Sequence, residues 1–155
     1  MAMPNYELEG DVGLGGLATF NMLHGFPEAL VRGMRSGFLR DSDYHHLCQC
    51  DNLEDVKMNL METDYGAYLQ NESGISPQVL ETCAMNKLVM EFNYLKSHSI
   101  HPLTTFLEYI TYEYMIENVM LLLRGTLSGR SVNELIAQCH PLGMFKESIM
   151  RSIPH

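Results

Sequence analysis

The longest apolar stretch of the sequence, from Leu103 to Leu123, limits most strongly what this chain can fold into. Its length is about what an α-helix needs to span a bilayer. Three glutamates, Glu108, Glu113 and Glu117, interrupt the stretch, and each carboxylate would cost several kcal/mol in hydrocarbon. We therefore interpret the stretch as a long helix buried in a soluble protein, and not as a membrane span.

Helical spacing recurs along most of the remaining chain. Asp51 is a predicted N-cap with Glu54 as the third residue after it, and Ser76 is a predicted N-cap before a helix that Pro77 opens. A further helix starts near Phe26. The residues expected to face the core are Phe26, Ala29, Leu30, Met34 and Phe38 in this helix, Leu53, Val56 and Leu60 in the second, and Leu80, Ala84, Leu88, Phe92 and Leu95 in the third.

Loops and helix ends complete the pattern. Residues 70–76 and 98–102 are predicted breaks, and Gly125 is expected to end the long helix. Ser131 and Glu134 form the spacing of a capping box for a last short helix. Since no segment alternates convincingly like a strand and no Asn-Gly or Asp-Gly turn occurs, the predicted fold class is all-α with six or seven helices.

Proline and glycine add detail to the first helix. Pro27 fits the first turn, where its missing N–H costs nothing. Gly33 and Gly37 lie one turn apart on the apolar face, and each weakens the helix by about 1 kcal/mol. We expect close approach of another backbone to compensate this cost.

Residues 1–22 are rich in glycine and show no sustained periodicity, so we interpret them as a flexible leader before a helical domain at 23–155. The leader contains the run GDVGLGG, which suggests a phosphate-binding loop. Such a loop needs a preceding strand, a following helix and usually a lysine or acidic partner at fixed distance. None of these is recognisable, so the flexible leader is the preferred interpretation.

The formal net charge of −9, from 10 basic and 19 acidic side chains, makes nucleic acid and bare anionic lipid poor partners. The same charge would suit a basic protein. Four cysteines occur, and no hydrophobic signal segment leads the chain, so we expect reduced thiols in the cytosol.

A zinc site is one alternative that the cysteines suggest. His45, His46, Cys48 and Cys50 lie close together in the sequence, and the Cys139-His140 pair could complete a tetrahedral shell. A C-x-C pair on a helix points its thiols about 160° apart, however, which does not suit one ion. We expect buried cysteines that act as small hydrophobic residues and no metal.

Catalytic alternatives are also weak. Cys139 and His140 are adjacent, and adjacent side chains on a helix do not face each other. Sequence leaves open a spatial pairing of a thiol with His24 or His101. Of the three glutamates, Glu113 and Glu117 share a helix face and Glu108 does not, which favours solvated or interface charge over acid–base chemistry. We expect no catalytic residue.

Five stretches together resemble one family, subunit d of eukaryotic V-type proton ATPases, which is related to the C-type subunit of the archaeal-type enzymes. They occur in the family's order over residues 24–145, so the combined signal is specific. The stretches are HGFPEALVRGMRSGFLRDSDY (24–44), LCQCDNLEDVKMNL (47–60), TDYGAYL (63–69), FLEYITYEYMIENVMLLLRGTL (106–127) and CHPLGMF (139–145).

The resemblance implies the N-terminal portion of a longer fold, a curved array of antiparallel helices. It implies a non-catalytic, cofactor-free rotor adaptor that joins the proteolipid c-ring to the central stalk of the pump. Such an adaptor would lie at the cytosolic face of vacuolar or endosomal membranes and contact the membrane only through the complex. The alternative is a free-standing helical interaction module derived from the same family.

Six residues are candidates for the interface of such an adaptor. Arg32 and Arg35 suit acidic partners, and Tyr65 and Tyr68 are amphipathic anchors. The full set is Phe26, Arg32, Arg35, Asp64, Tyr65 and Tyr68.

Overall fold

The computed structural model describes residues 14–70, 72, 74–145 and 147–152, and every regular element in these ranges is a helix. This confirms the all-α prediction. The long helices are α1 (Leu14–Ser36), α5 (Pro77–Ser97) and α6 (Leu103–Leu127). The short ones are α2 (Asp41–Cys48), α3 (Leu53–Met61), α4 (Gly66–Leu69), α7 (Val132–Gln138), the 3₁₀ helix η1 (Pro141–Gly143) and α8 (Glu147–Ser152).

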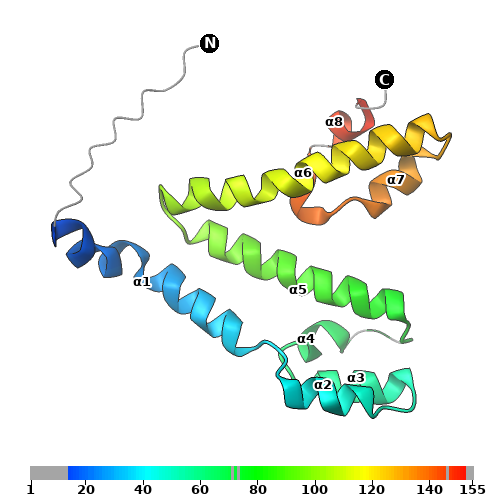
Figure 1. The fold of residues 1–155 in the computed structure, drawn as a ribbon, viewed down its shortest axis with the longest axis horizontal. Coiled ribbons are helices and arrows are strands. Elements are labelled where there is room, and N and C mark those ends of the chain that lie inside the picture. The colour runs from blue at the N-terminus through cyan, green and yellow to red at the C-terminus, as the bar shows by residue number, and fades with distance from the viewer. Residues whose placement is uncertain (1–13, 71, 73, 146, 153–155) are drawn as a thin grey trace.

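The three long helices run antiparallel to their neighbours in an open array (Figure 1). Helix α5 lies between α1 and α6, and α1 packs mainly against α5. Helices α2, α3 and α4 gather at the end where α1 finishes and α5 begins. Helix α7 and η1 pack against α6, the last long helix of the row. Because the long helices form one row, each has sides that no other long helix covers.

Helix α1 begins at Leu14, much earlier than the expected start at Phe26. Residues 14–22 of the predicted leader are therefore helical, and residues 1–13 lie outside the described part. Pro27 is inside α1 and buried, not in its first turn. Burial of the Pro27 ring offsets the one backbone hydrogen bond that proline removes, and good helix formers such as Met22 and Leu23 extend the helix before it.

The predicted buried face of α1 is only partly correct. Leu30 and Met34 are half-buried, but Phe26 and Ala29 are exposed, and so is Phe38, which lies after the end of α1. A helix with one main neighbour buries a narrow stripe, so a full apolar face is not covered.

The expected backbone approach to Gly33 is wrong, and at Gly37, which follows the end of α1, the close neighbour is a side chain. Nothing lies within 4 Å of a Cβ built on Gly33, so no backbone approaches it. A Cβ on Gly37 would collide with the Asp64 side chain. The close approach at Gly37 thus involves the turn between α3 and α4, through a side chain.

The start of α5 is confirmed, and the start of α3 is displaced by one residue. Ser76 caps α5 by accepting a hydrogen bond from the Val79 N–H at 3.2 Å, and Pro77 follows it. Asn52, not Asp51, caps α3, because its side chain accepts from the Asp55 N–H at 2.9 Å.

The predicted core faces of α3 and α5 are again partly correct. Val56 and Leu60 of α3 and Leu80, Phe92 and Leu95 of α5 are half-buried, whereas Leu53, Ala84 and Leu88 are exposed. The fully buried positions of α5 are Cys83 and Lys87.

The loop over residues 70–76, where described, and the break over 98–102 are confirmed. The apolar stretch forms a long helix as predicted, but several of its large hydrophobic side chains are exposed and not buried. Within the described ranges, no helix has the combination of length and hydropathy that a membrane span requires. The predicted end at Gly125 is wrong. Gly125 is buried inside α6, where a Cβ would collide with the Leu135 side chain, and α6 ends at Leu127. Gly129, with φ of 76°, reverses the chain instead.

Ser131 is the N-cap of α7, as expected, but its side chain makes no capping hydrogen bond. The predicted capping box with Glu134 is therefore not formed. Packing of Leu135 against Gly125 stabilises this short helix. A capping rule based on neighbouring residues does not predict such a tertiary contact.

A polar contact between α6 and η1 organises the last part of the chain. The buried Asn118 side chain donates to the His140 carbonyl at 3.0 Å and accepts from the His140 N–H at 2.7 Å. The His140 ring stacks on Tyr114, with centroids 3.9 Å apart. A Cβ on Gly143 would collide with the Tyr114 carbonyl, so only glycine fits. We call Tyr114, Asn118, His140 and Gly143 the α6–η1 clamp.

Next to the clamp lies the most buried hydrophobic cluster among the described residues. It joins α6, α7 and α8 through Leu122, Leu135, Cys139 and Met150. Burial of such side chains contributes about 1.5–3 kcal/mol each. The clamp and this cluster together hold the C-terminal helices on one side of α6.

Replacing Gly143 with alanine tests the clamp. We expect Gly143→Ala to lower the free energy of unfolding by about 1–3 kcal/mol, because the methyl group must displace the α6 backbone at Tyr114. The matched control is Gly33→Ala, which meets open space in a helix and should raise stability by about 0.5–1 kcal/mol. Urea denaturation measures both. Equal effects of the two substitutions would contradict the close packing at Gly143.

The His140 side chain should make stability depend on pH. Burial lowers the pKa of its imidazole below the ordinary 6.5, although the Glu117 carboxylate acts in the opposite direction. The unfolded chain therefore binds a proton at higher pH than the folded chain, so this contribution is complete above about pH 6.5 and declines as the pH falls toward the folded pKa.

The difference in unfolding free energy between wild type and His140→Asn, which does not titrate, should accordingly shrink between about pH 7.5 and pH 5. Thermal or urea unfolding across this range measures it. A difference that stays constant would show that the folded and unfolded states bind the His140 proton equally.

Candidate functional site

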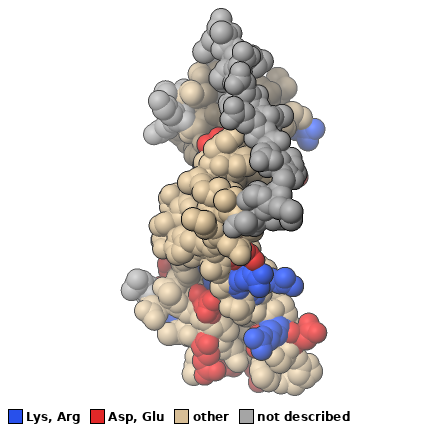
Figure 2. Space-filling model, turned by 90° about the vertical axis from the view of Figure 1, so that its left-hand side faces the viewer, with Lys and Arg blue, Asp and Glu red and all other residues tan. Residues whose placement is uncertain are grey.

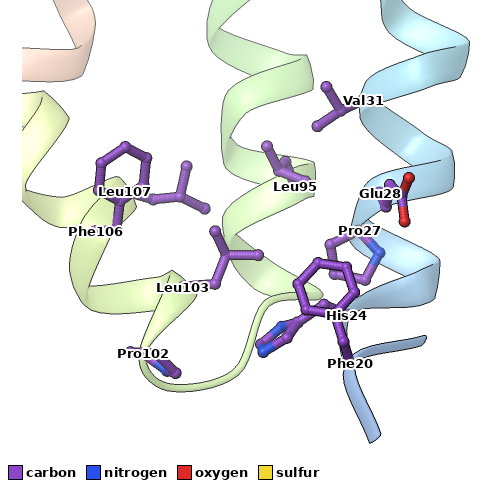
Figure 3. A pocket seen from close by; sticks show the side chains of 10 residues that line it. All are labelled: Phe20, His24, Pro27, Glu28, Val31, Leu95, Pro102, Leu103, Phe106 and Leu107. Atoms are coloured by element: carbon purple, nitrogen blue, oxygen red, sulfur yellow. The ribbon is translucent and has the colours of Figure 1, made fainter. Parts of the chain in front are cut away.

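An apolar groove between three helices is the candidate functional site. It has a volume of about 510 Å³ and lies between α1, the end of α5 and the start of α6. Figure 3 shows side chains from all three helices directed into this space. Its lining consists of Phe20, His24, Pro27, Glu28, Val31, Leu95, Pro102, Leu103, Phe106 and Leu107.

The apolar lining of the α1–α5–α6 groove is substantially open to solvent. Phe20, Val31 and Phe106 are 47%, 47% and 59% exposed. On the face in Figure 2, charged side chains gather toward the lower part, and the described surface above them is largely uncharged. An apolar hollow that is open to solvent is typical of a surface that another apolar chain segment covers.

His24 gives the groove a buried polar atom without a partner. Its Nδ1 is shielded from solvent and has no hydrogen-bond partner among the described residues, and its ring packs against Phe20 at 5.3 Å. An unsatisfied buried nitrogen costs about 1–3 kcal/mol, so an occupant of the groove that supplies a hydrogen bond would gain this amount.

The candidate residues on α1 lie along one edge of the array. Phe26 is 54% exposed, and its ring meets the His98 ring edge-on at 5.3 Å at the end of α5. Arg32 pairs with Glu28, with 3.0 Å between Nε and the carboxylate, on the exposed surface. Arg35 is exposed in the last turn of α1. Arg32 thus has an acidic partner on its own helix, whereas Arg35 forms no ion pair with the described residues; Phe26, Arg32 and Arg35 are all exposed.

The other three candidates lie around α4, at the far end of α1. Asp64 is exposed and lies against the backbone at Gly37. Tyr65 is half-buried, with the Lys87 ammonium 5.1 Å from its ring centroid. The Tyr68 carbonyl accepts a hydrogen bond from the buried Cys83 thiol at 3.2 Å. Tyr65 and Tyr68 therefore hold α4 on α5, and of this group Asp64 is the most available to a partner.

Lys87 makes a contact that sequence reasoning missed. Its side chain is 4% exposed and forms an ion pair with Glu91 at 2.5 Å, on the side of α5 that faces Tyr65. A lone lysine in the middle of an amphipathic helix gives no sequence signal of burial, because lysine is normally solvated. The groove was missed for another reason, since its walls come from three separate helices.

The surroundings of the two buried cysteines, Cys83 and Cys139, favour the protonated thiol. Burial raises the pKa of the Cys83 and Cys139 thiols, and the Glu72 carboxylate raises that of Cys83 further, so both favour the unreactive thiol. No group of three His, Cys, Asp or Glu side chains among the described residues has the geometry to hold a metal ion. His45 instead contacts Gln49, and the Cys50 thiol donates to the His46 carbonyl.

Comparison with known proteins gives consistent matches over most of the chain. The family model for the ATP synthase (C/AC39) subunit matches residues 27–153. The chain is 49% identical to "V-type proton ATPase subunit d" of Dictyostelium discoideum over 142 residues, which is 91% of this chain and 40% of that protein.

Two further relatives agree. The identity is 53% over 131 residues to the probable subunit d of Oryza sativa and 44% over 128 residues to subunit d of Saccharomyces cerevisiae. These matches cover 83% and 81% of this chain but 37% of each relative. The chain therefore spans about two fifths of the length of the curated relatives it matches.

The Lys87 contact yields a stability prediction. Lys87→Ala should lower the free energy of unfolding by about 1–3 kcal/mol, because Glu91 loses its charged partner and the Tyr65 ring loses the cation beside it. The matched control is Lys96→Ala, which removes an exposed ion pair with Glu108 and should cost less than about 1 kcal/mol. Chemical denaturation compares the two, and a larger loss for Lys96 would reject the role given to Lys87.

Proposed function

The chain belongs to the ATP synthase (C/AC39) subunit family together with V-type proton ATPase d subunits, and we propose that it serves as a non-catalytic adaptor in such a pump. In this role it joins the proteolipid c-ring to the central stalk and transmits torque between them. It would lie at the cytosolic face of vacuolar or endosomal membranes and contact lipid only through the complex. The proposal rests mainly on the 44–53% identity to V-type proton ATPase subunit d sequences.

The physical properties of the described residues support an adaptor. Torque transfer requires stiff elements and adhesive surfaces, and it requires no bond-making chemistry. The antiparallel helices supply stiffness, and the clamp fixes the C-terminal helices on α6. The groove and the exposed Phe26 supply apolar contact area, while Arg35 and Asp64 supply charges at the edge of the array. The candidate set Phe26, Arg32, Arg35, Asp64, Tyr65 and Tyr68 is thus divided between direct contacts and residues that position α4.

Co-purification with the pump tests this function. A tagged chain should be recovered with the V-type ATPase from gently solubilised membranes, at one copy per complex by quantitative mass spectrometry. Val31→Glu places a carboxylate in the groove at a 47% exposed position and should reduce recovery at least about tenfold, as expected for loss of an interface contact. The control Met58→Glu makes the same kind of change on α3, at a 67% exposed position, and should leave recovery unchanged.

Other outcomes separate the alternatives. If wild-type chain remains in the soluble fraction while the pump is complete without it, the free-standing interaction module replaces the adaptor. If Val31→Glu and Met58→Glu both bind normally, the chain is a pump component but the groove is not its interface. Circular dichroism of both variants establishes that the helical fold is kept.

A further inference from the structure

The outer face of α6 carries a regular apolar repeat that the clamp does not use. Seven positions follow one another at alternating spacings of three and four residues along the whole helix. This is the a/d spacing of a coiled-coil seam. We call these positions the outer seam: Phe106, Tyr109, Glu113, Ile116, Met120, Leu123 and Leu127.

The outer seam is exposed along the length of α6. Its six apolar members are between 39% and 89% exposed, with Leu123 and Leu127 at the two extremes. The buried residues of α6 are Leu107, Asn118, Leu122 and Gly125, and the last three face η1 and α7, away from the seam. Helix α6 is therefore apolar on two sides, of which the described structure covers one. At 1.5 Å per residue the helix is about 37 Å long, enough for more than three heptads.

The surface beside the seam has a recess into which side chains of another helix fit. An apolar hollow of about 330 Å³ lies next to Ile116 and Met120. Its remaining lining is Tyr112, Met115, Val119 and Phe145, so no charged side chain contributes to it. Knobs-into-holes packing requires such recesses between seam residues.

Glu113 is the one charged residue of the seam, and its charge identifies the occupant. It is exposed, and no basic side chain of the described residues forms an ion pair with it. A helix packed on the seam would surround this carboxylate, and a buried charge is costly unless an opposite charge meets it. From this geometry we propose that the outer seam binds a long α-helix that has its own apolar heptad repeat and one lysine or arginine opposite Glu113.

A second copy of this chain is a poorer occupant. In a parallel pair of α6 helices, the two Glu113 carboxylates would face each other at the same level of the seam and repel. In an antiparallel pair centred on Ile116, Glu113 would meet the apolar Met120 and remain without a counter-charge. A basic residue on a different helix satisfies Glu113 in either direction.

Binding of designed helices to the isolated chain tests the proposal. The probes are two fluorescent synthetic helices of about four heptads with leucine and isoleucine at the seam, one with lysine and one with glutamate opposite Glu113. Fluorescence anisotropy is measured below the concentration at which the probes self-associate. Wild type should bind the lysine helix at least about tenfold more tightly than the glutamate helix.

Reversing the charge should reverse the preference. Glu113→Lys should favour the glutamate helix, while the control Glu134→Lys, an identical charge change on an exposed position of α7, should keep the wild-type preference. Circular dichroism verifies that each variant is folded.

Three results would overturn the proposal. The first is equal affinity for both helices, and the second is no binding of either helix. The third is self-association of the chain that prevents probe binding and that the substitution Ile116→Glu abolishes. No pump component is present in this experiment, so a negative result does not contradict the adaptor function. If the adaptor function is rejected instead, probe binding still tests the outer seam.

Discussion

The pair of hydrogen bonds between the Asn118 side chain and the His140 backbone is the contact on which the arrangement around α6 depends. An asparagine buried in a helix is tolerated only when both ends of its amide are satisfied, and one residue does this here. The contact brings η1 against α6, where Gly143 permits backbone approach and the hydrophobic cluster follows. All of this occupies one side of α6, so the outer seam remains available to a partner.

Around α1, α4 and α5 the helices are held together by different contacts. Lys87 and the Tyr68 carbonyl attach α4 to α5, but α1 has one main neighbour and leaves an apolar groove. Apolar surface of this extent is unusual on a protein that functions alone. The described helices thus leave many apolar side chains exposed outside the core, which supports the adaptor that we propose.

Sequence was sufficient for features with local causes. Ser76 and Pro77 define the start of α5 because a cap needs only neighbouring residues, and the long apolar stretch forms a helix as predicted. Prediction from sequence failed where tertiary contacts determine which residues are buried and where a helix ends. Gly125 was taken as a helix end because glycine commonly ends helices, but it lies inside α6 because Leu135 of another helix packs against it. The burial of Lys87 likewise depends on Tyr65 and Glu91. Phe26 and Phe38 were expected inside since periodicity reports an apolar face but not what covers it.

The central claim is that the chain works through apolar helix faces that become covered in a larger assembly. Oxidative footprinting of methionines tests this most directly, by comparing the isolated chain with the chain assembled in the pump. Met120 of the outer seam is 40% exposed and Met58 of α3 is 67% exposed, so both should oxidise in the isolated chain. The account predicts that assembly protects Met120 and leaves Met58 reactive. Equal oxidation of Met120 in both states would contradict it.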